Sequence, residues 1–212
     1  VAAPVFADLS YVGGKGAGRA GAATTVVVDI TTGLTGGSGG APLANDLVVV
    51  TVSVGTAARQ PALNITTPAG YTCLTAQRTT ATTYDTNVQT CYKIMGSTPD
   101  TSVTVPATGN TADGQGYAVQ VFRGVDTATT MDVTATYATG TGVDNLPDPA
   151  AIQPVTSGAW IVVCGGGAAS IGTTAYTAAY LTNLQFYNGP DTNDGQVGAG
   201  YYTGWTSGSY NP

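Results

Sequence analysis

The sequence predicts an all-β protein, folded as an antiparallel β-sandwich or a jelly-roll-like variant of it. Threonine and valine are abundant, and their stiff χ1 angles suit a pleated strand. Glutamate, a strong helix former, does not occur, and Lys and Arg together number only 6. Apolar residues recur mostly with a period of two, which is the strand period. We therefore expect helix in no more than about a tenth of the residues.

Short apolar or alternating segments, separated by turn residues such as the Thr-Pro-Ala-Gly of 67–70, predict the individual strands. The only segment that approaches a helical pattern is 173–182, and its Thr and Tyr content favours strand or loop. The predicted strands are residues 8–12, 24–30, 46–54, 71–77, 87–95, 102–105, 116–122, 132–137, 159–164, 180–186 and 197–203.

The chain is expected to form one domain over residues 1–212. A hydrophobic fraction of 42% is enough for a real core, and all-β domains often reach this size undivided. The glycine-rich stretch 13–21 suggests a flexible N-terminal arm over about residues 1–23, and 33–40 suggests a surface loop. A proline-containing segment, 140–154, is expected to connect the two halves of the sandwich. Two separate domains are less favoured, because few strands follow that segment.

The predicted core comes from strands in which every second residue is apolar, since alternate residues share one face of a sheet. An aromatic residue next to such a strand is expected to anchor it. The residues expected to be buried are Val48, Val50, Tyr71, Val119, Val121, Trp160 and Val162.

The charge pattern excludes two classes of partner. The net charge is −6 and the few cations are scattered, whereas a nucleic-acid interface needs clustered Lys and Arg. No run approaches the roughly 20 apolar residues that span a bilayer, so no membrane association is expected. Only 8% of the residues are charged, so the hydration of the surface depends mainly on hydroxyl and backbone groups. Such a surface suits a protein built into an assembly better than a freely diffusing one.

The inventory of reactive side chains argues against catalysis. There is no His, which excludes a His-dependent triad and leaves a zinc site without support. All 12 acidic residues are Asp, mostly in turn-like settings where Asp caps backbone N–H groups. A hydrolase with an Asp pair is therefore not favoured. We predict a protein that is not an enzyme, with no catalytic, cofactor-binding or metal-binding residues and no cofactor.

One loop leaves a cation site open as an alternative. Residues 191–195 read Asp-Thr-Asn-Asp-Gly, which places oxygen ligands at the close spacing that hard cations such as calcium prefer. The loop lacks the distal Glu of an EF-hand. An Asx-rich turn is the favoured interpretation.

The three cysteines also leave an alternative open. A hairpin turn centred at residue 82 would place Cys73 directly opposite Cys91, close enough for a disulfide. Two reduced, half-buried thiols are slightly favoured over that disulfide. Cys164 follows the apolar residues 160–163 and is expected to be a small core residue.

Aromatic residues gather towards the end of the chain. Exposed, they could stack on sugar rings or anchor an interface; buried, they are core and sheet rim. We expect at least half of them to be buried. They are Tyr180, Phe186, Tyr187, Tyr201, Tyr202, Trp205 and Tyr210.

Several short motifs follow one another along the chain. They are NDLVVVTVS (45–53), TPAGYTCL (67–74), TCYKI (90–94), AVQVFRGVD (118–126), GAWIVV (158–163) and WTSG (205–208).

The order of these motifs resembles a diffuse family of β-sandwich virion proteins from tailed bacteriophages and prophages. That family typically has a GDLLV strand, a PxGW turn, a YYK strand, an RGVD strand and turn, and a second LVV strand. Tyr71 stands where the family usually has Trp, and the cysteines are not typical of it. The family pattern also continues one strand beyond an Asn-Pro such as 211–212.

The resemblance implies a non-enzymatic structural protein on the outer surface of a phage capsid or tail. The favoured role is capsid decoration, with the major capsid protein and copies of the chain itself as partners, the trimer being the expected form. The alternative is a tail-fibre or adhesion module that binds cell-surface glycan. We expect the N-terminal arm, residues 1–21, or the C-terminus to contact another subunit by adding a strand to a sheet edge. The turn 123–126 is expected to pin the end of a strand, with Gly124 at an unusual φ.

Overall fold

The structure is a computed structural model that describes residues 8–20, 25–56, 65–80, 85–106, 114–139, 149–167, 181–187 and 195–211. This part of the chain contains strands, turns and irregular segments and no helix, so the predicted all-β class is confirmed. The strands are β1 (Ser10–Ala20), β2 (Val26–Asp29), β3 (Leu47–Thr56), β4 (Thr72–Cys73), β5 (Gln77–Thr80), β6 (Asp85–Ile94), β7 (Ser102–Val105), β8 (Gly114–Arg123), β9 (Ile161–Gly167), β10 (Thr182–Tyr187) and β11 (Gln196–Tyr202).

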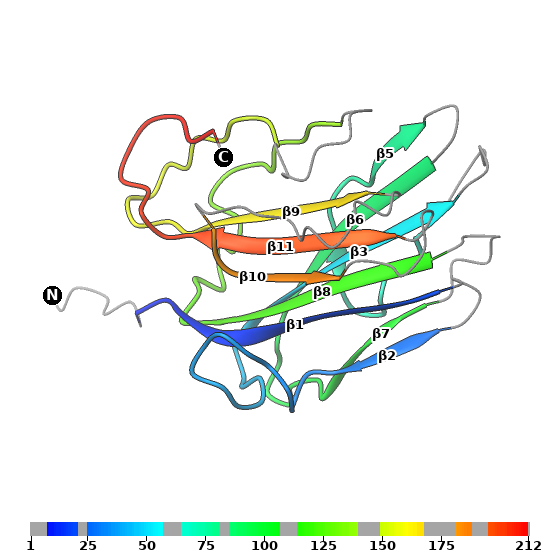
Figure 1. Cartoon of the computed structure of the whole chain (residues 1–212). Helices are drawn as coiled ribbons and strands as arrows, with labels where there is room; N and C mark the ends of the chain where they lie inside the picture. The colour runs from blue at the N-terminus through cyan, green and yellow to red at the C-terminus, as the bar shows by residue number, and fades with distance from the viewer. Residues whose placement is uncertain are drawn as a thin grey trace, which may run out of the picture.

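Three antiparallel sheets pack on one another to form a β-sandwich with an extra layer (Figure 1). The central sheet has the order β1-β8-β3-β6-β4, and β5 also pairs with β6. A sheet of order β10-β11-β9 covers one of its faces, in front in Figure 1. The pair β2-β7 packs on the opposite face, because its buried residues join the alternate residues of β3 and β8. The central sheet is therefore enclosed on both sides.

The larger core lies between the central sheet and the β2-β7 pair. Val48, Val50 and Val52 alternate along β3 and all point into it, where they meet Val28 and Ile30 of the neighbouring layer. Each of these side chains is almost fully buried, and burying a Val or Ile stabilises a fold by about 1.5–3 kcal/mol. This core is the main reason why the strands adopt their register.

The opposite face of the central sheet carries an aromatic cluster. Phe122 of β8 lies 5.4 Å from the ring of Tyr11 and 5.5 Å from that of Tyr201, and it meets Trp160 edge-on at 6.2 Å. Trp160 and Tyr201 are stacked, with ring centroids 4.8 Å apart. Because these residues come from β1, β8, β11 and the segment before β9, the cluster joins the two larger sheets.

Glycine allows the two larger sheets to approach closely elsewhere along this interface. A Cβ on Gly14 would lie 2.7 Å from Cγ of Gln185, and a Cβ on Gly18 would overlap the ring of Tyr187. Both glycines lie on β1, directly beneath β10. Side chains of β10 therefore pack directly on the bare backbone of β1 at these two positions.

Most of the predicted strands are confirmed, and 102–105 matches β7 at both ends. The strand predicted at 71–77 is only partly right, because the structure has the two-residue β4 there, an irregular segment at 74–76, and β5 beginning at residue 77. The predicted strand 132–137 is wrong, because these residues form an irregular segment. Its polar groups bond to another loop instead of to a ladder: Oδ2 of Asp132 accepts from the amides of Val155 and Thr156, and Oγ1 of Thr136 donates to the carbonyl of Ala150.

The predicted flexible arm is wrong over residues 10–20, which form β1. This strand pairs with β8 from Ser10↔Arg123 to Ala20↔Gly114, with one irregularity between Tyr11 and Gly13. Residues 1–7 and 21–24 lie outside the described part of the chain. The glycines suggested a flexible segment in the sequence, whereas in the structure they leave room for the side chains of β10.

The predicted core is confirmed for Val48, Val50, Tyr71, Val119 and Val121, all of which are buried. It is wrong for Trp160 and Val162, which are only partly buried and pack against the aromatic cluster. Their neighbours Ile161 and Val163 are the buried residues of β9, because a C-terminal segment with Trp205 covers the outer face of that strand.

The long connection expected at 140–154 does join the two halves of the sandwich, since β8 belongs to the central sheet and β9 to the outer one. Residues 140–148 lie outside the described part of the chain. Of the weak helix candidate, 173–182, residues 173–180 lie outside it as well, as do residues 191–194 of the possible cation loop 191–195.

Candidate functional site

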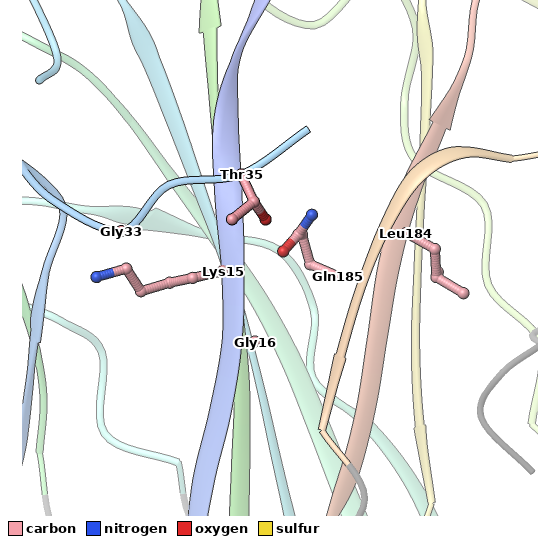
Figure 2. Close-up of a pocket in the computed structure, with 6 residues that line it drawn as sticks. All are labelled: Lys15, Gly16, Gly33, Thr35, Leu184 and Gln185. Atoms are coloured by element: carbon pink, nitrogen blue, oxygen red, sulfur yellow. The ribbon is translucent and has the colours of Figure 1, made fainter. Parts of the chain in front are cut away.

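A shallow pocket opens between β1, β10 and the loop 33–35 (Figure 2). Its volume is about 380 Å³, and its lining residues are Lys15, Gly16, Gly33, Thr35, Leu184 and Gln185. Sequence reasoning did not identify it, because it joins segments that are far apart in the chain and carry no recognisable motif.

The polar groups of this pocket are already engaged within the chain. Nζ of Lys15 donates to the carbonyl of Asp29, and Oγ1 of Thr35 donates to that of Gly14. Nε2 of Gln185 donates to the carbonyl of Asn183 at 3.3 Å. Figure 2 shows the side chain of Lys15 extending away from Gln185, while Leu184 points the opposite way. The side chains therefore do not converge on a common point, as a ligand site requires.

Several described aspartates accept hydrogen bonds from nearby backbone or pair with a single cation. Oδ1 of Asp29 accepts from the amide and hydroxyl of Thr31, and Oδ2 accepts from Thr32 Oγ1. These bonds hold the pKa of the Asp29 carboxyl well below its usual range. Oδ1 of Asp126 accepts from the amide of Ala128, as expected for an Asx turn. Within the described residues no three His, Cys, Asp or Glu side chains group as metal ligands would.

The last residue of β8, Arg123, forms a two-point ion pair with Asp46. Nε and Nη2 of Arg123 donate to the two carboxylate oxygens of Asp46 at 3.0 and 2.7 Å. Asp46 is only 1% exposed and also accepts from the amide of Leu43. Its hydrogen bonds raise the pKa of the Arg123 guanidinium. Gly124 has φ +81°, so the predicted pinned strand end with an unusual glycine is confirmed.

Arg123→Ala should lower the free energy of unfolding by about 2–3 kcal/mol, because it leaves the buried Asp46 carboxylate without its charged partner. Urea denaturation of the two proteins measures the difference. Lys93→Ala is the matched control, since the Asp100 carboxylate of the 2.6 Å Lys93 pair is 29% exposed, against 2% for Asp46, so that its loss of a partner should cost less. Equal losses in both variants would contradict a special role for the Arg123 pair.

Cys73 and Cys91 form a disulfide between β4 and β6, so the slightly favoured prediction of two reduced thiols is wrong. The predicted pairing is right: the two residues lie directly opposite each other, and their Cα atoms are 3.9 Å apart. Cys164 is free and partly buried. Burial raises the pKa of its thiol, and the neighbouring hydroxyls of Thr51 and Thr90 oppose that effect.

The C-terminal aromatic residues lie against the body of the protein. Tyr201 and Trp205 are buried, and Nε1 of Trp205 donates to the carbonyl of Gly208. Tyr202 and Tyr210 are partly buried and stacked, with centroids 4.5 Å apart. Residue 180 lies outside the described part of the chain. These rings pack on one another and on the sheet, which is the arrangement expected of core and sheet rim.

Three exposed apolar side chains lie in two neighbouring segments, one of which pairs with the C-terminal Tyr210 through Ile152. Met131, Tyr137 and Val155 are each at least 37% exposed, and Val155 is 76% exposed. Hydrogen bonds between 131–137 and 149–156, described above for Asp132 and Thr136, hold their two segments side by side. We call these three residues the apolar end surface. This surface was not predicted from the sequence, because its two segments were interpreted as a strand and a connection.

Comparison with known proteins gives no match: no family model fits the chain, and no curated protein or solved structure is significantly similar to it. Among the described residues, none forms a helix that is long and apolar enough to cross a membrane.

Proposed function

We propose that this chain is a non-enzymatic structural protein of a bacteriophage virion that decorates the outer surface of the capsid. The order of the five strand and turn motifs carries the proposal. Two of those motifs belong to the central sheet. The segment 45–53 contains most of β3, the middle strand of that sheet, and 118–126 contains the second half of β8 and the turn after it. The proposed partners are the major capsid protein and further copies of this chain.

The chemistry of the described surface supports a role based on shape. A decoration protein needs a rigid body and a contact face of low charge. The central sheet is buried on both faces, and only 8% of all residues are charged. The pocket beside Lys15 lacks convergent polar groups, and the described aspartates act in turns and pairs.

The alternative of a glycan-binding tail-fibre module has less support. Sugar recognition by stacking requires an aromatic face open to solvent. Tyr201 and Trp205 are buried, and Tyr202 is stacked on Tyr210. The described C-terminal aromatics therefore offer no flat exposed platform of the expected kind.

The number of copies per particle tests the proposed location. We expect purified virions to contain this chain in hundreds of copies, in a fixed ratio to the major capsid protein. Quantitative mass spectrometry with an isotope-labelled standard measures that ratio. Three to a dozen copies would place the chain in the tail or fibre, and its absence from virions would overturn the proposal altogether.

The apolar end surface is the proposed contact with the capsid. Val155→Asp should weaken binding of the purified chain to particles that lack it, because it places a charge in an interface that excludes water. Co-sedimentation at several protein concentrations measures the affinity. Val27→Asp is the matched control: Val27 is 64% exposed, but it lies on the β2-β7 layer. If both variants bind as the wild type does, the capsid contact lies elsewhere.

A further inference from the structure

The Cys73–Cys91 pair joins a minimal edge strand to the core. β4 has only two residues and pairs with β6 through Thr72↔Tyr92 and Cys73↔Cys91. One further backbone bond, from the amide of Leu74 to the carbonyl of Thr90, continues this contact. Such a short strand has little backbone hydrogen bonding of its own, so the covalent bond adds to the buried ring of Tyr71 in attaching it.

The two sulfur atoms differ in their access to solvent. Cys91 is fully buried within the larger core, whereas Cys73 is partly buried at its margin. A small thiol or disulfide reagent therefore reaches Cys73 first. Cys91 lies directly opposite Cys73, so the sulfur within its reach is Sγ of Cys73.

We propose that the Cys73–Cys91 pair is a redox-sensitive lock: its disulfide holds β4 against β6, and its reduction releases β4. Cys73 is the residue that reacts first with an external thiol or disulfide, and Cys91 is the resolving cysteine. In a reducing cytoplasm both residues are thiols, and in oxidising surroundings they form the disulfide. The lock does not depend on the proposed virion function, because it follows from the strand pairing and the burial of the two residues alone.

Closure of the lock uses a low-molecular-weight disulfide such as oxidised glutathione. The Cys73 thiolate attacks one sulfur of that disulfide, forms a mixed disulfide and releases one small thiolate. The Cys91 thiolate then attacks the Cys73 sulfur and releases the second. Two protein thiols are oxidised, one small disulfide is reduced to two thiols, and the two protons from the protein end on those thiols. Reduction by excess small thiol is the reverse sequence and begins at Cys73.

Trapping of the intermediate tests the assignment of the two cysteines. Four reduced proteins are incubated with oxidised glutathione: the wild type, Cys73→Ser, Cys91→Ser and Cys164→Ser. The reactions are quenched in acid, and mass spectrometry measures the mass of each intact protein. We expect Cys91→Ser to retain one glutathionyl group on Cys73 and Cys73→Ser to gain none. Wild type and Cys164→Ser should form the internal disulfide without an adduct. Equal adduct formation in Cys73→Ser and Cys91→Ser, or a wild type that stops at the mixed disulfide, would overturn the assignment.

Hydrogen exchange of the wild type tests the lock itself and needs no variant to fold. Reduction should increase amide exchange in residues 71–74 more than in β3 and β8, because the bond links β4 directly to β6, whereas the other strands lose only the global stability that the bond contributes. Unchanged exchange in 71–74 on reduction would show that the bond does not hold this edge. An increase by the same factor in 71–74, β3 and β8 would show that the bond stabilises only the fold as a whole.

Discussion

Phe122→Ala should lower the free energy of unfolding by about 3–5 kcal/mol, the largest loss we expect from any single substitution. Phe122 is 2% exposed and touches the rings of Tyr11, Tyr201 and Trp160. Its removal leaves a cavity at the point where the two larger sheets meet. Each lost aromatic contact adds about 0.5–1.5 kcal/mol to the cost of the buried area alone. Urea denaturation followed by tryptophan fluorescence measures the loss, since Trp160 reports on this cluster.

Two control variants separate packing from other causes. Phe122→Leu keeps most of the apolar volume and should lose much less stability than Phe122→Ala. Tyr137→Ala removes an exposed ring and should change the free energy of unfolding by no more than about 0.5 kcal/mol. If Phe122→Ala lost less than about 1 kcal/mol, the aromatic cluster would not be what joins the sheets.

Loss of the Cys73–Cys91 disulfide should cost about 3 kcal/mol. The bond closes a loop between residues separated by 18 positions, and the entropy that it removes from the unfolded chain scales with that length. Cys73→Ala is the preferred variant, because Cys73 is partly exposed and its replacement leaves the core nearly intact. Urea denaturation without reductant compares it with the wild type.

The free cysteine provides the matched control for this prediction. Cys164→Ala removes a sulfur from the sheet interface without removing a cross-link. With excess reductant, the wild type and Cys73→Ala should become nearly equal in stability. If Cys73→Ala were as stable as the wild type without reductant, the disulfide would contribute nothing to the free energy of unfolding.

The positions of most strands could be predicted because alternation and turn residues are local properties of a sequence. β7, with its Ser-Val-Thr-Val pattern, is the clearest case. The segment 132–137 has similar composition, but its Asp132 and Thr136 bond to a loop about twenty residues away. Which alternate residues of β9 are buried could not be predicted either, because apolar residues face packed layers on both sides of this strand.

The features proposed to carry function were harder to predict than the fold. The opposition of Cys73 and Cys91 follows from counting residues around a turn, but the oxidation state does not. The apolar end surface joins two segments that look unrelated in the sequence. Arg123 and Asp46 are 77 positions apart, and only the pairing of β3 with β8 brings them together.

The close approach of the two larger sheets has a consequence for how this sequence can evolve. The valine core of β3 can accept combined apolar substitutions if its neighbours adjust, because a core tolerates swaps that keep its total volume. A single methyl group at Gly14, Gly18 or Gly166 would instead meet an atom of the facing layer, such as Oγ of Ser53 at 2.6 Å from Gly166. Substitutions are therefore tolerated least at these glycines, which have no side chain. Descendants of this protein would be recognised by the spacing of these glycines more reliably than by their hydrophobic residues.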